Sequence, residues 1–373
     1  GVVRAVREVF DLGEDELLAD PQLVNAQAVG AALAAAEAGE ADAQLAALQA
    51  ALGGESAGQA DDLARLPRLP HVDCTPNRGF ALAPSPWNPA GAPAYDGGAV
   101  PRSAAVDALA AGQPVPVALG VDVGSTSTNL VLVSTDGVLL DAQYLRTRGN
   151  PKQAVRDGLA SLAQRVGSRA HVVAAGVTGS GRTMIGNLIG ADAVRDEITA
   201  QARAAAAADP LVDTVFEIGG QDSKAIRLNE NGEVVDFVMN DKCAAGTGRF
   251  LEMMARTLEM DISEMGPESL KWKEDIDISS MCSVFAESEV ISLIALNKEK
   301  ADIAHGLHKA IANKSYSLLK RVGLNETFMM TGGVAKNPGV VKAVEEKLGS
   351  KLFICKEPEI VGALGAALFG LDK

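Results

Sequence analysis

Short apolar runs that end in glycine-rich turns are the main pattern in the C-terminal two thirds of the chain. Residues 115–124 alternate in the manner of a β-strand, residues 125–129 form a Ser/Thr-rich turn after a glycine, and residues 130–133 continue as a second strand. Residues 213–226 repeat this order: a strand, a glycine-rich turn containing an acidic residue, and another strand. The pattern therefore predicts two β-hairpins that lie far apart in the sequence.

Other apolar runs have different periods. Residues 328–331 predict a strand, and the diglycine turn at 332–333 leads toward a helix from Gly339. Residues 251–255 and 284–294 carry apolar positions at helical spacing. Strands, hairpins and helices in this order predict an α/β protein, with two duplicated subdomains that grip one ligand from both sides.

The first part of the chain has a different organisation. Residues 1–10 match residues 339–348 at six of ten positions, and weaker matches follow in the same order. We therefore predict that residues 1–38 are the C-terminal remnant of a preceding copy of the same domain. In residues 39–115 an Ala/Gln-rich, helix-like piece passes into a stretch from Pro67 that is dense in Pro, Gly and Ala. So many prolines exclude a long helix or central strand there, and we predict that residues 39–115 are a linker or an extended arm.

The ordered domain is expected over residues 116–373. Its predicted parts are a first subdomain at about 116–210, a second subdomain with the cysteines at about 211–340, and a C-terminal helix at 341–373 that returns to the first.

The hairpin turns have the composition of a phosphate site. Residues 124–127, Gly-Ser-Thr-Ser, present backbone N–H groups and hydroxyls, while Asp122 at the strand end can hold Mg²⁺ directly or through water. Residues 219–222, Gly-Gly-Gln-Asp, form the matching turn of the second hairpin. Gly332 and Gly333 allow close approach of a flat ligand such as adenine or ribose. The Gly-Lys-Ser/Thr signature of a P-loop is absent from the sequence.

Two cysteines stand close to predicted helices. Cys243 and Cys282 each precede a stretch that is expected to form the first turn of a helix. The N-terminus of a helix carries about half a positive charge, which lowers the pKa of a thiol and favours an anionic metal–sulfur centre. A cubane iron–sulfur cluster takes four thiolates, so a symmetric dimer with two from each chain is the simplest completion. The alternative is that both are inert core cysteines.

The composition narrows the possible functions. The chain has 373 residues, of which 47% are hydrophobic, as in a globular protein of two or three domains. The net charge of −14 argues against a nucleic-acid or anionic-membrane partner, and no stretch approaches the about 20 apolar residues of a membrane span. Four cysteines in so long a chain do not make a disulfide framework, so we predict a reducing, cytoplasmic setting.

These motifs together resemble the ATP-dependent activators of 2-hydroxyacyl-CoA dehydratases and the ATPase subunits of benzoyl-CoA reductase. The resemblance rests on residues 122–127, 219–224, 240–248, 281–289 and 331–337, and it covers about residues 116–373. It implies an acetate kinase, heat-shock chaperone and actin-like ATPase fold, in which two subdomains have mixed β-sheets flanked by helices. The preceding repeat resembles large members of this family with tandem ATPase domains.

The resemblance also implies cofactors and partners. ATP or ADP and Mg²⁺ would bind between the subdomains, and one 4Fe-4S cluster on Cys243 and Cys282 would be shared by two ATPase domains, in a homodimer or with a sister domain. Ferredoxin or flavodoxin would donate the electron, and a dehydratase or reductase would receive it. The implied catalytic residues are Asp122, Asp222 and Gln221, and the implied nucleotide contacts are Gly124, Ser125, Thr126, Ser127, Gly219, Gly220, Gln221, Gly246, Gly332, Gly333 and Lys336. Members often carry Gln where this chain has Glu359.

Three alternatives share the nucleotide motifs. A sugar or carboxylate kinase would not need the two cysteines, and an ATP-regulated binding module would have no redox step. A degenerate ATPase half would serve a structural role only. Elsewhere in the chain, His171, His305 and His308 lack metal-ligand companions and are expected to be surface or hydrogen-bonded residues, and Cys355 is expected in the core.

Overall fold

The computed structural model describes residues 113–373, apart from 136–138, 167–168, 242 and 279–281, together with 74–76, 108 and 111. The predicted remnant at 1–38 and most of the predicted linker at 39–115 lie outside these residues. Within the described part of the chain, no helix is both long and apolar enough to cross a membrane.

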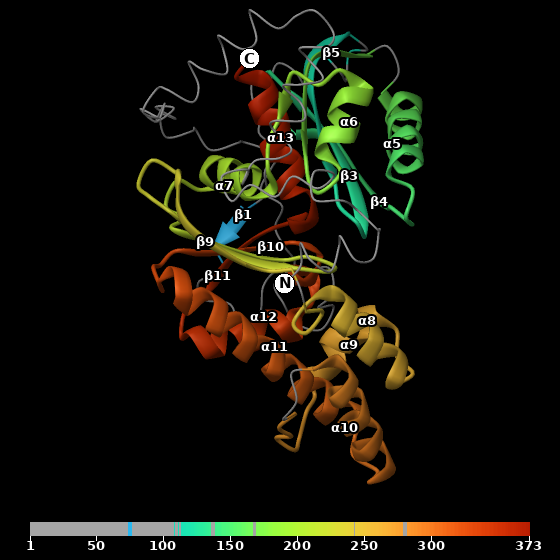
Figure 1. Cartoon of the computed structure of the whole chain (residues 1–373), viewed down its shortest axis with the longest axis vertical. Helices are drawn as coiled ribbons and strands as arrows, with labels where there is room; N and C mark the ends of the chain where they lie inside the picture. The colour runs from blue at the N-terminus through green and yellow to red at the C-terminus, as the bar shows by residue number, and fades with distance from the viewer. Residues whose placement is uncertain are drawn as a thin grey trace, which may run out of the picture. The chain divides into compact units, whose positions relative to one another are not determined.

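The first sheet has five strands in the order β4-β3-β2-β5-β6 (Figure 1). β2, β3 and β4 pair antiparallel, whereas β5 and β6 continue the sheet in parallel from β2. The strands are β2 Val115–Val123, β3 Ser127–Ser134, β4 Leu139–Arg146, β5 Ala170–Thr178 and β6 Ala193–Val194. The predicted first hairpin is therefore confirmed as β2 and β3.

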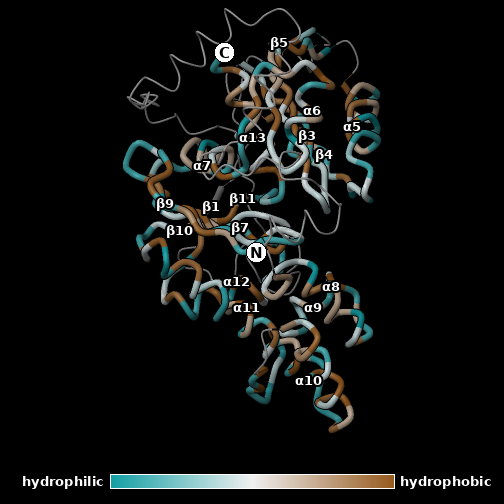
Figure 2. The backbone as a smooth tube through the Cα atoms, viewed as in Figure 1, coloured by the Kyte–Doolittle hydropathy of each residue, from teal (hydrophilic) through white to brown (hydrophobic). Residues whose placement is uncertain are grey.

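Helices cover both faces of this sheet, so β2 is mostly apolar, with Asp122 near its end as the one charged residue. Its odd-numbered residues, such as Val117 and Val121, pack in one core with residues of α5 and α6, while Ala118 packs in another core with residues of α7 and α13. These helices are α5 Pro151–Val166, α6 Arg182–Ile189, α7 Glu197–Ala208 and α13 Val361–Leu371. Figure 2 shows the apolar residues gathered in the strands and along α13, which is buried along nearly its whole length.

The second sheet has the order β1-β11-β10-β7-β8-β9. β7, β8 and β9 pair antiparallel, β10 and β11 extend the sheet in parallel from β7, and β1 joins the edge antiparallel to β11. The strands are β1 Cys74–Pro76, β7 Thr214–Ile218, β8 Ser223–Leu228, β9 Val234–Asn240, β10 Phe328–Thr331 and β11 Leu352–Cys355. The predicted second hairpin is confirmed as β7 and β8, and the predicted strand at 328–331 as β10.

Five helices and a large apolar core accompany this sheet (Figure 1). The long helix α11 packs on β8 and β9 and also contacts α9 and α12. The helices are α8 Gly248–Thr257, α9 Ile262–Ser269, α10 Ser283–Ala295, α11 Lys300–Val322 and α12 Pro338–Leu348. The α/β class with two mixed sheets flanked by helices is as predicted.

The element boundaries differ from the sequence expectations in two places. Cys243 lies in the glycine-rich loop before α8, as predicted, but the helix begins only at Gly248 and not immediately after the cysteine. The stretch 341–373 divides, because most of α12 and all of β11 belong with the second sheet, and only α13 packs against strands of the first.

Candidate functional site

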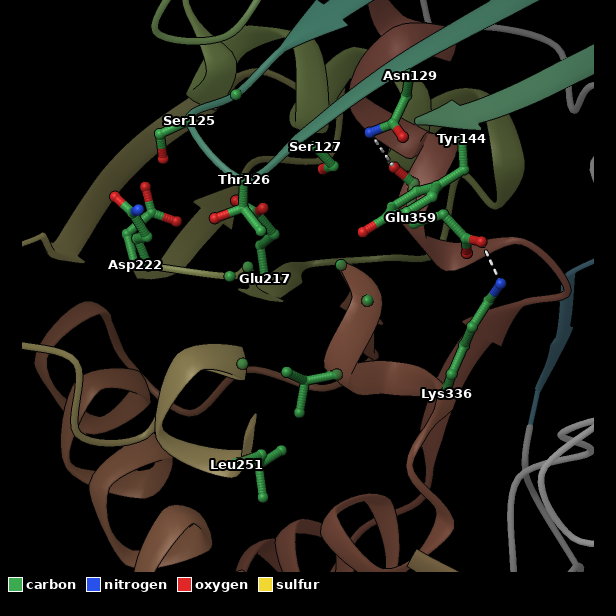
Figure 3. A pocket seen from close by; sticks show the side chains of 18 of the residues that line it. Ser125, Thr126, Ser127, Asn129, Tyr144, Glu217, Asp222, Leu251, Lys336 and Glu359 are labelled. Carbon is green, nitrogen blue, oxygen red and sulfur yellow. Dashed lines mark hydrogen bonds and ion pairs between the residues drawn. The ribbon is translucent and has the colours of Figure 1, made fainter. Parts of the chain in front are cut away.

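A cavity of about 860 Å³ lies between the turns of the two hairpins, helices α8 and α9, and the segment before α12. Figure 3 shows Ser125 and Thr126 of the first hairpin above Glu217 and Asp222 of the second. All but one of the predicted catalytic and nucleotide-contact residues line it: Asp122, Gly124, Ser125, Thr126, Ser127, Gly219, Gly220, Gln221, Asp222, Gly332, Gly333 and Lys336. Gly246 is not among the lining residues; it has φ +83° in the loop before α8 and backs onto Lys314.

The two hairpin turns are in direct contact. A Cβ atom on Gly220 would lie 2.7 Å from Oγ1 of Thr126, so only glycine fits there. In the amide orientation that satisfies both neighbours, Gln221 donates to Oγ of Ser125 at 2.9 Å and accepts from Arg249 at 2.7 Å. The turns are thus joined by close packing and by one hydrogen-bonded side chain.

The second hairpin also caps helix α8. The backbone N–H groups of Gly248 and Arg249 donate to the carbonyl oxygens of Gly219 and Gly220, at 2.9 and 2.8 Å. The N-cap residue Thr247 makes no side-chain capping bond, so the hairpin carbonyls take that role. The turn of the second hairpin is therefore bonded directly to the start of α8.

A buried lysine contacts three acidic side chains on one side of the cavity, which we call the acidic wall. Lys224, 1% exposed, contacts Glu217 at 2.7 Å, Asp222 at 2.9 Å and Glu197 at 3.6 Å. Burial alone would lower the pKa of Lys224, but the carboxylates of Glu217, Asp222 and Glu197 outweigh it and raise that pKa above its usual value. One ammonium group faces three carboxylates, so this wall has a net negative charge.

Asp122 adds a further carboxylate beside this cluster. Its side chain is packed against backbone, since a Cβ on Gly179 or Gly362 would lie 2.5 or 2.4 Å from a carboxylate oxygen. Although Asp122 keeps some solvent exposure, burial, and then the charges of Glu217 and Glu197, raise its pKa to about 7. A bound cation would remove this electrostatic cost.

The acidic wall lacks a complete protein-only metal site. Among the described residues, no group of three or more His, Cys, Asp or Glu side chains is arranged to hold a metal ion. Mg²⁺ is usually held by one or two carboxylates together with water and phosphate oxygens. Asp122 and Asp222 both line the cavity, so the lining contains two carboxylates, the number that this pattern requires of the protein.

Another part of the cavity lining holds a cluster of polar side chains that connects strand β3 of the first sheet to the segment before α12 (Figure 3). Lys336 forms an ion pair with Glu359, and Nδ2 of Asn129 in β3 donates to the backbone carbonyl of Glu359 at 3.0 Å. Burial raises the pKa of Glu359 despite the opposing effect of Lys336. Lys336, predicted as a ligand contact, is thus held at the cavity wall by a carboxylate.

The two cysteines lie outside the cavity lining, and both are exposed. The carbonyl of Cys243 accepts a bond from Nδ2 of Asn240 at 3.0 Å, whereas Cys282 is the N-cap residue of α10. A hydrogen bond of 3.2 Å from Thr257 to Glu287 connects α8 to α10. Cys355 is buried, as expected from the sequence.

Some polar lining residues were not among the predicted ones. Glu197 begins α7, and Glu217 interrupts the apolar strand β7; an acidic residue within an apolar strand was the one available signal for Glu217. Glu197 resembles any acidic residue of a first helical turn, and nothing in its neighbourhood of the sequence marks it as a cavity residue.

Two mixed sheets, with glycine hairpins that meet at a cavity, define a protein of the actin-like ATPase type, as the fold prediction stated. More narrowly, the chain belongs to the BadF/BadG/BcrA/BcrD ATPase family, whose family model matches residues 119–370. This membership confirms the resemblance seen in the sequence.

Several characterised proteins are similar to this domain. The 2-hydroxyisocaproyl-CoA dehydratase activator of Clostridioides difficile is 38% identical over 256 residues, covering 68% of this chain and 95% of that protein. The (R)-2-hydroxyglutaryl-CoA dehydratase activating ATPase of Acidaminococcus fermentans is 40% identical over 259 residues, covering 68% and 97%. A solved structure of the 2-hydroxyisocaproyl-CoA dehydratase activator from Clostridium difficile, with bound ADPNP, has a TM-score of 0.62 and 37% identity, covering 69% and 94%.

Proposed function

We propose that this chain is an ATP-hydrolysing iron–sulfur protein of the cytoplasm that passes a low-potential electron from ferredoxin or flavodoxin to a 2-hydroxyacyl-CoA dehydratase-like or benzoyl-CoA reductase-like partner. Its family membership and the names of its relatives support the activator role. The turn of the second hairpin is hydrogen-bonded to α8, and α8 is hydrogen-bonded to α10. These contacts connect the proposed phosphate site to both cysteine-bearing segments and support a coupling of ATP hydrolysis to electron transfer.

The cavity supports ATP or ADP as the ligand. Its volume of about 860 Å³ is large enough for a nucleoside triphosphate, and a similar activator structure contains ADPNP. The two glycine turns would hold the phosphates, and Gly332 and Gly333 would lie against the nucleoside. Asp122 and Asp222 would hold Mg²⁺ with phosphate oxygens, and Gln221 would orient the attacking water.

Cys243 and Cys282 suit half of a 4Fe-4S site. Both are exposed, and the segments that carry them are connected through α8 and α10. Two thiolates require two more, so a second ATPase domain would complete the site, either in a homodimer or from a sister domain. When bound, the cluster would supply a one-electron centre of low potential.

The contact between hairpin and helix carries the proposed coupling. Gly219 and Gly220 bind the first N–H groups of α8, the loop before α8 holds Cys243, and Thr257 of α8 binds Glu287 of α10. When phosphate contacts at Gly219 and Gly220 change, both cysteine-bearing segments would move with the hairpin.

Anaerobic reconstitution with iron and sulfide tests the cluster. We expect about four irons per pair of ATPase domains in the wild type and in Cys355→Ala, which removes a buried thiol of the core, but loss of bound iron in Cys243→Ala and Cys282→Ala. Iron analysis, EPR spectra and the mass of the assembly are the measurements. Retention of the cluster in either of the latter variants contradicts the proposed ligands.

The coupling needs a separate experiment. With a reduced ferredoxin and a dehydratase partner, wild-type turnover should require hydrolysable ATP, whereas Cys282→Ala should still hydrolyse ATP without activating the partner. A phosphorylated small molecule formed without iron would instead identify a kinase.

A further inference from the structure

A buried histidine connects α9, α11 and α12 beside the cavity. His308 of α11 is 1% exposed, and its Nδ1 lies 2.9 Å from Oγ of Ser269 at the end of α9. Its Nε2 lies 3.3 Å from Nδ2 of Asn337, the N-cap residue of α12. Asn337 lines the cavity, whereas neither His308 nor Ser269 does.

The hydrogen bonds determine which nitrogen of His308 carries the proton. The hydroxyl of Ser269 donates its one hydrogen to the carbonyl of Gly266 at 2.7 Å, so toward His308 it acts as an acceptor. Nδ1 therefore carries the hydrogen, and Nε2 accepts from the amide of Asn337. Burial lowers the pKa of His308 to about 3, which keeps the ring neutral at physiological pH.

Asn337 is then fixed from both sides. Its Oδ1 accepts from the backbone N–H of Val340 at 3.0 Å, while its Nδ2 donates to His308. The fit around it is tight, because a Cβ on Gly266 would lie 2.7 Å from Oδ1 of Asn337. Gly266 lines the cavity as well, so this network sets the spacing between α9 and the turn before α12.

We infer that His308 is a positioning residue for the nucleoside end of the nucleotide site, acting through Asn337. The two stretches of cavity lining that it spaces, at 262–266 and 333–338, contribute no acidic lining residue and include the apolar residues Ile262, Val334 and Pro338. A flat, apolar base fits between such walls, whereas the phosphates belong with the glycine turns. The inference rests on the proposed nucleotide function.

Two substitutions at one position separate the two bonds of His308. Asn places an amide near the position of Nδ1, so His308→Asn keeps the bond to Ser269 and loses the acceptor for Asn337. Gln places an amide oxygen near the position of Nε2, so His308→Gln keeps that acceptor. Ser315→Ala is the matched stability control, because it removes a buried hydroxyl of the same helix that bonds only its own backbone at Ile311.

Calorimetry with Mg-ATP and with Mg-tripolyphosphate is the measurement, together with steady-state ATP hydrolysis. We expect His308→Asn to weaken ATP about threefold to tenfold and to raise KM with little change in kcat, since one positioning hydrogen bond is lost. His308→Gln and Ser315→Ala should stay within about twofold, and tripolyphosphate affinity should be unchanged in all three.

Equal weakening of ATP by His308→Asn and His308→Gln, or no weakening by either, overturns the positioning role. A parallel loss of tripolyphosphate binding in His308→Asn also overturns it, because the defect then extends to the phosphate end. A wild-type protein that binds neither ligand overturns the nucleotide function itself, so the two failures are distinguishable.

Discussion

Asp122 is a carboxylate whose ionisation is opposed first by burial and then by neighbouring negative charges. Its neighbours include the carboxylates of Glu217 and Glu197, and the ammonium group of Lys224 only partly offsets them. A raised pKa means that the folded state binds the proton of Asp122 more tightly than the unfolded chain does. The side chain therefore destabilises the fold wherever it is ionised, and a cation would reverse this effect.

Replacement of Asp122 by Asn tests this cost. In the absence of Mg²⁺ and nucleotide, Asp122→Asn should raise stability at pH 8 by about 1 kcal/mol, or roughly 2–4 °C in Tm, after allowance for solvent access. The cost appears as pH rises from the unfolded pKa near 3.8 through the folded pKa of about 7, so the gain should be clearly smaller at pH 5 than at pH 8 and should vanish only below the unfolded pKa. Thermal melts at both pH values are the measurement, and ATP hydrolysis should be lost.

The opposite result would be informative. If Asp122→Asn lowered Tm equally at pH 5 and pH 8, its carboxylate would be making favourable contacts in the empty protein. The raised pKa would then be wrong.

At the residue scale, the sequence predicts the parts of the site that lie in local patterns. Asp122 lies near the end of β2, Asp222 and the hairpin glycines lie in the turns after β2 and β7, and all of them line the cavity. Glu197 lies at the start of α7, which packs on the first sheet, whereas its ion-pair partner Lys224 lies in β8 of the second sheet. Its place in the cavity wall therefore depends on how the two sheets are arranged. Local patterns do not contain that information.

At the element scale, α13 is held against the first sheet by backbone contact. A Cβ on Gly176 would lie 1.7 Å from the carbonyl oxygen of Ala366, and one on Gly120 would lie 2.0 Å from that of Ala363. The close contact explains why α13 and the facing strands carry small residues. Because α13 is buried along nearly its whole length, it is also apolar on every side.

Two glycine substitutions measure this contact. Gly176→Ala should destabilise the protein by about 3 kcal/mol or more, because a backbone must move, whereas Gly370→Ala, with its nearest contact at 3.1 Å, should cost at most about 1 kcal/mol. Urea unfolding of the two variants is the measurement. Similar costs for both would show that α13 can move away from the sheet.

The start of α8 shows where element prediction from sequence is weakest. Gly246, with φ +83°, belongs to the loop after Cys243, Thr247 is the N-cap residue, and the helix begins only at Gly248. Alternation and helical spacing locate the strands and helices well, but a cap made by a distant hairpin leaves no mark in the local sequence.

At the scale of the whole domain, one ion pair joins an edge strand of the first sheet to a helix of the second half of the domain. Arg146 of β4 forms an ion pair of 2.8 Å with Glu252 of α8, and both residues line the cavity. Their side chains are 51% and 26% exposed, so the pair contributes little to stability. Its position suits a contact that controls how readily the cleft opens.

A charge swap tests this role. Arg146→Glu and Glu252→Arg should each speed the release of a fluorescent ADP analogue about threefold, and the double variant should restore the wild-type rate, with Tm within roughly 2 °C throughout. Stopped-flow fluorescence is the measurement. A double variant that releases ADP as fast as the single ones would show that the pair does not hold the cleft.

The cap that the second hairpin makes on α8 has a consequence for how this protein can diverge. Both bonds join main-chain atoms, from Gly248 and Arg249 to Gly219 and Gly220, so side-chain replacement at Arg249 leaves its N–H donor in place. Proline is the one residue that would delete a donor there. Side chains around the loop that carries Cys243 can thus be exchanged while the two main-chain bonds between α8 and the second hairpin stay in place.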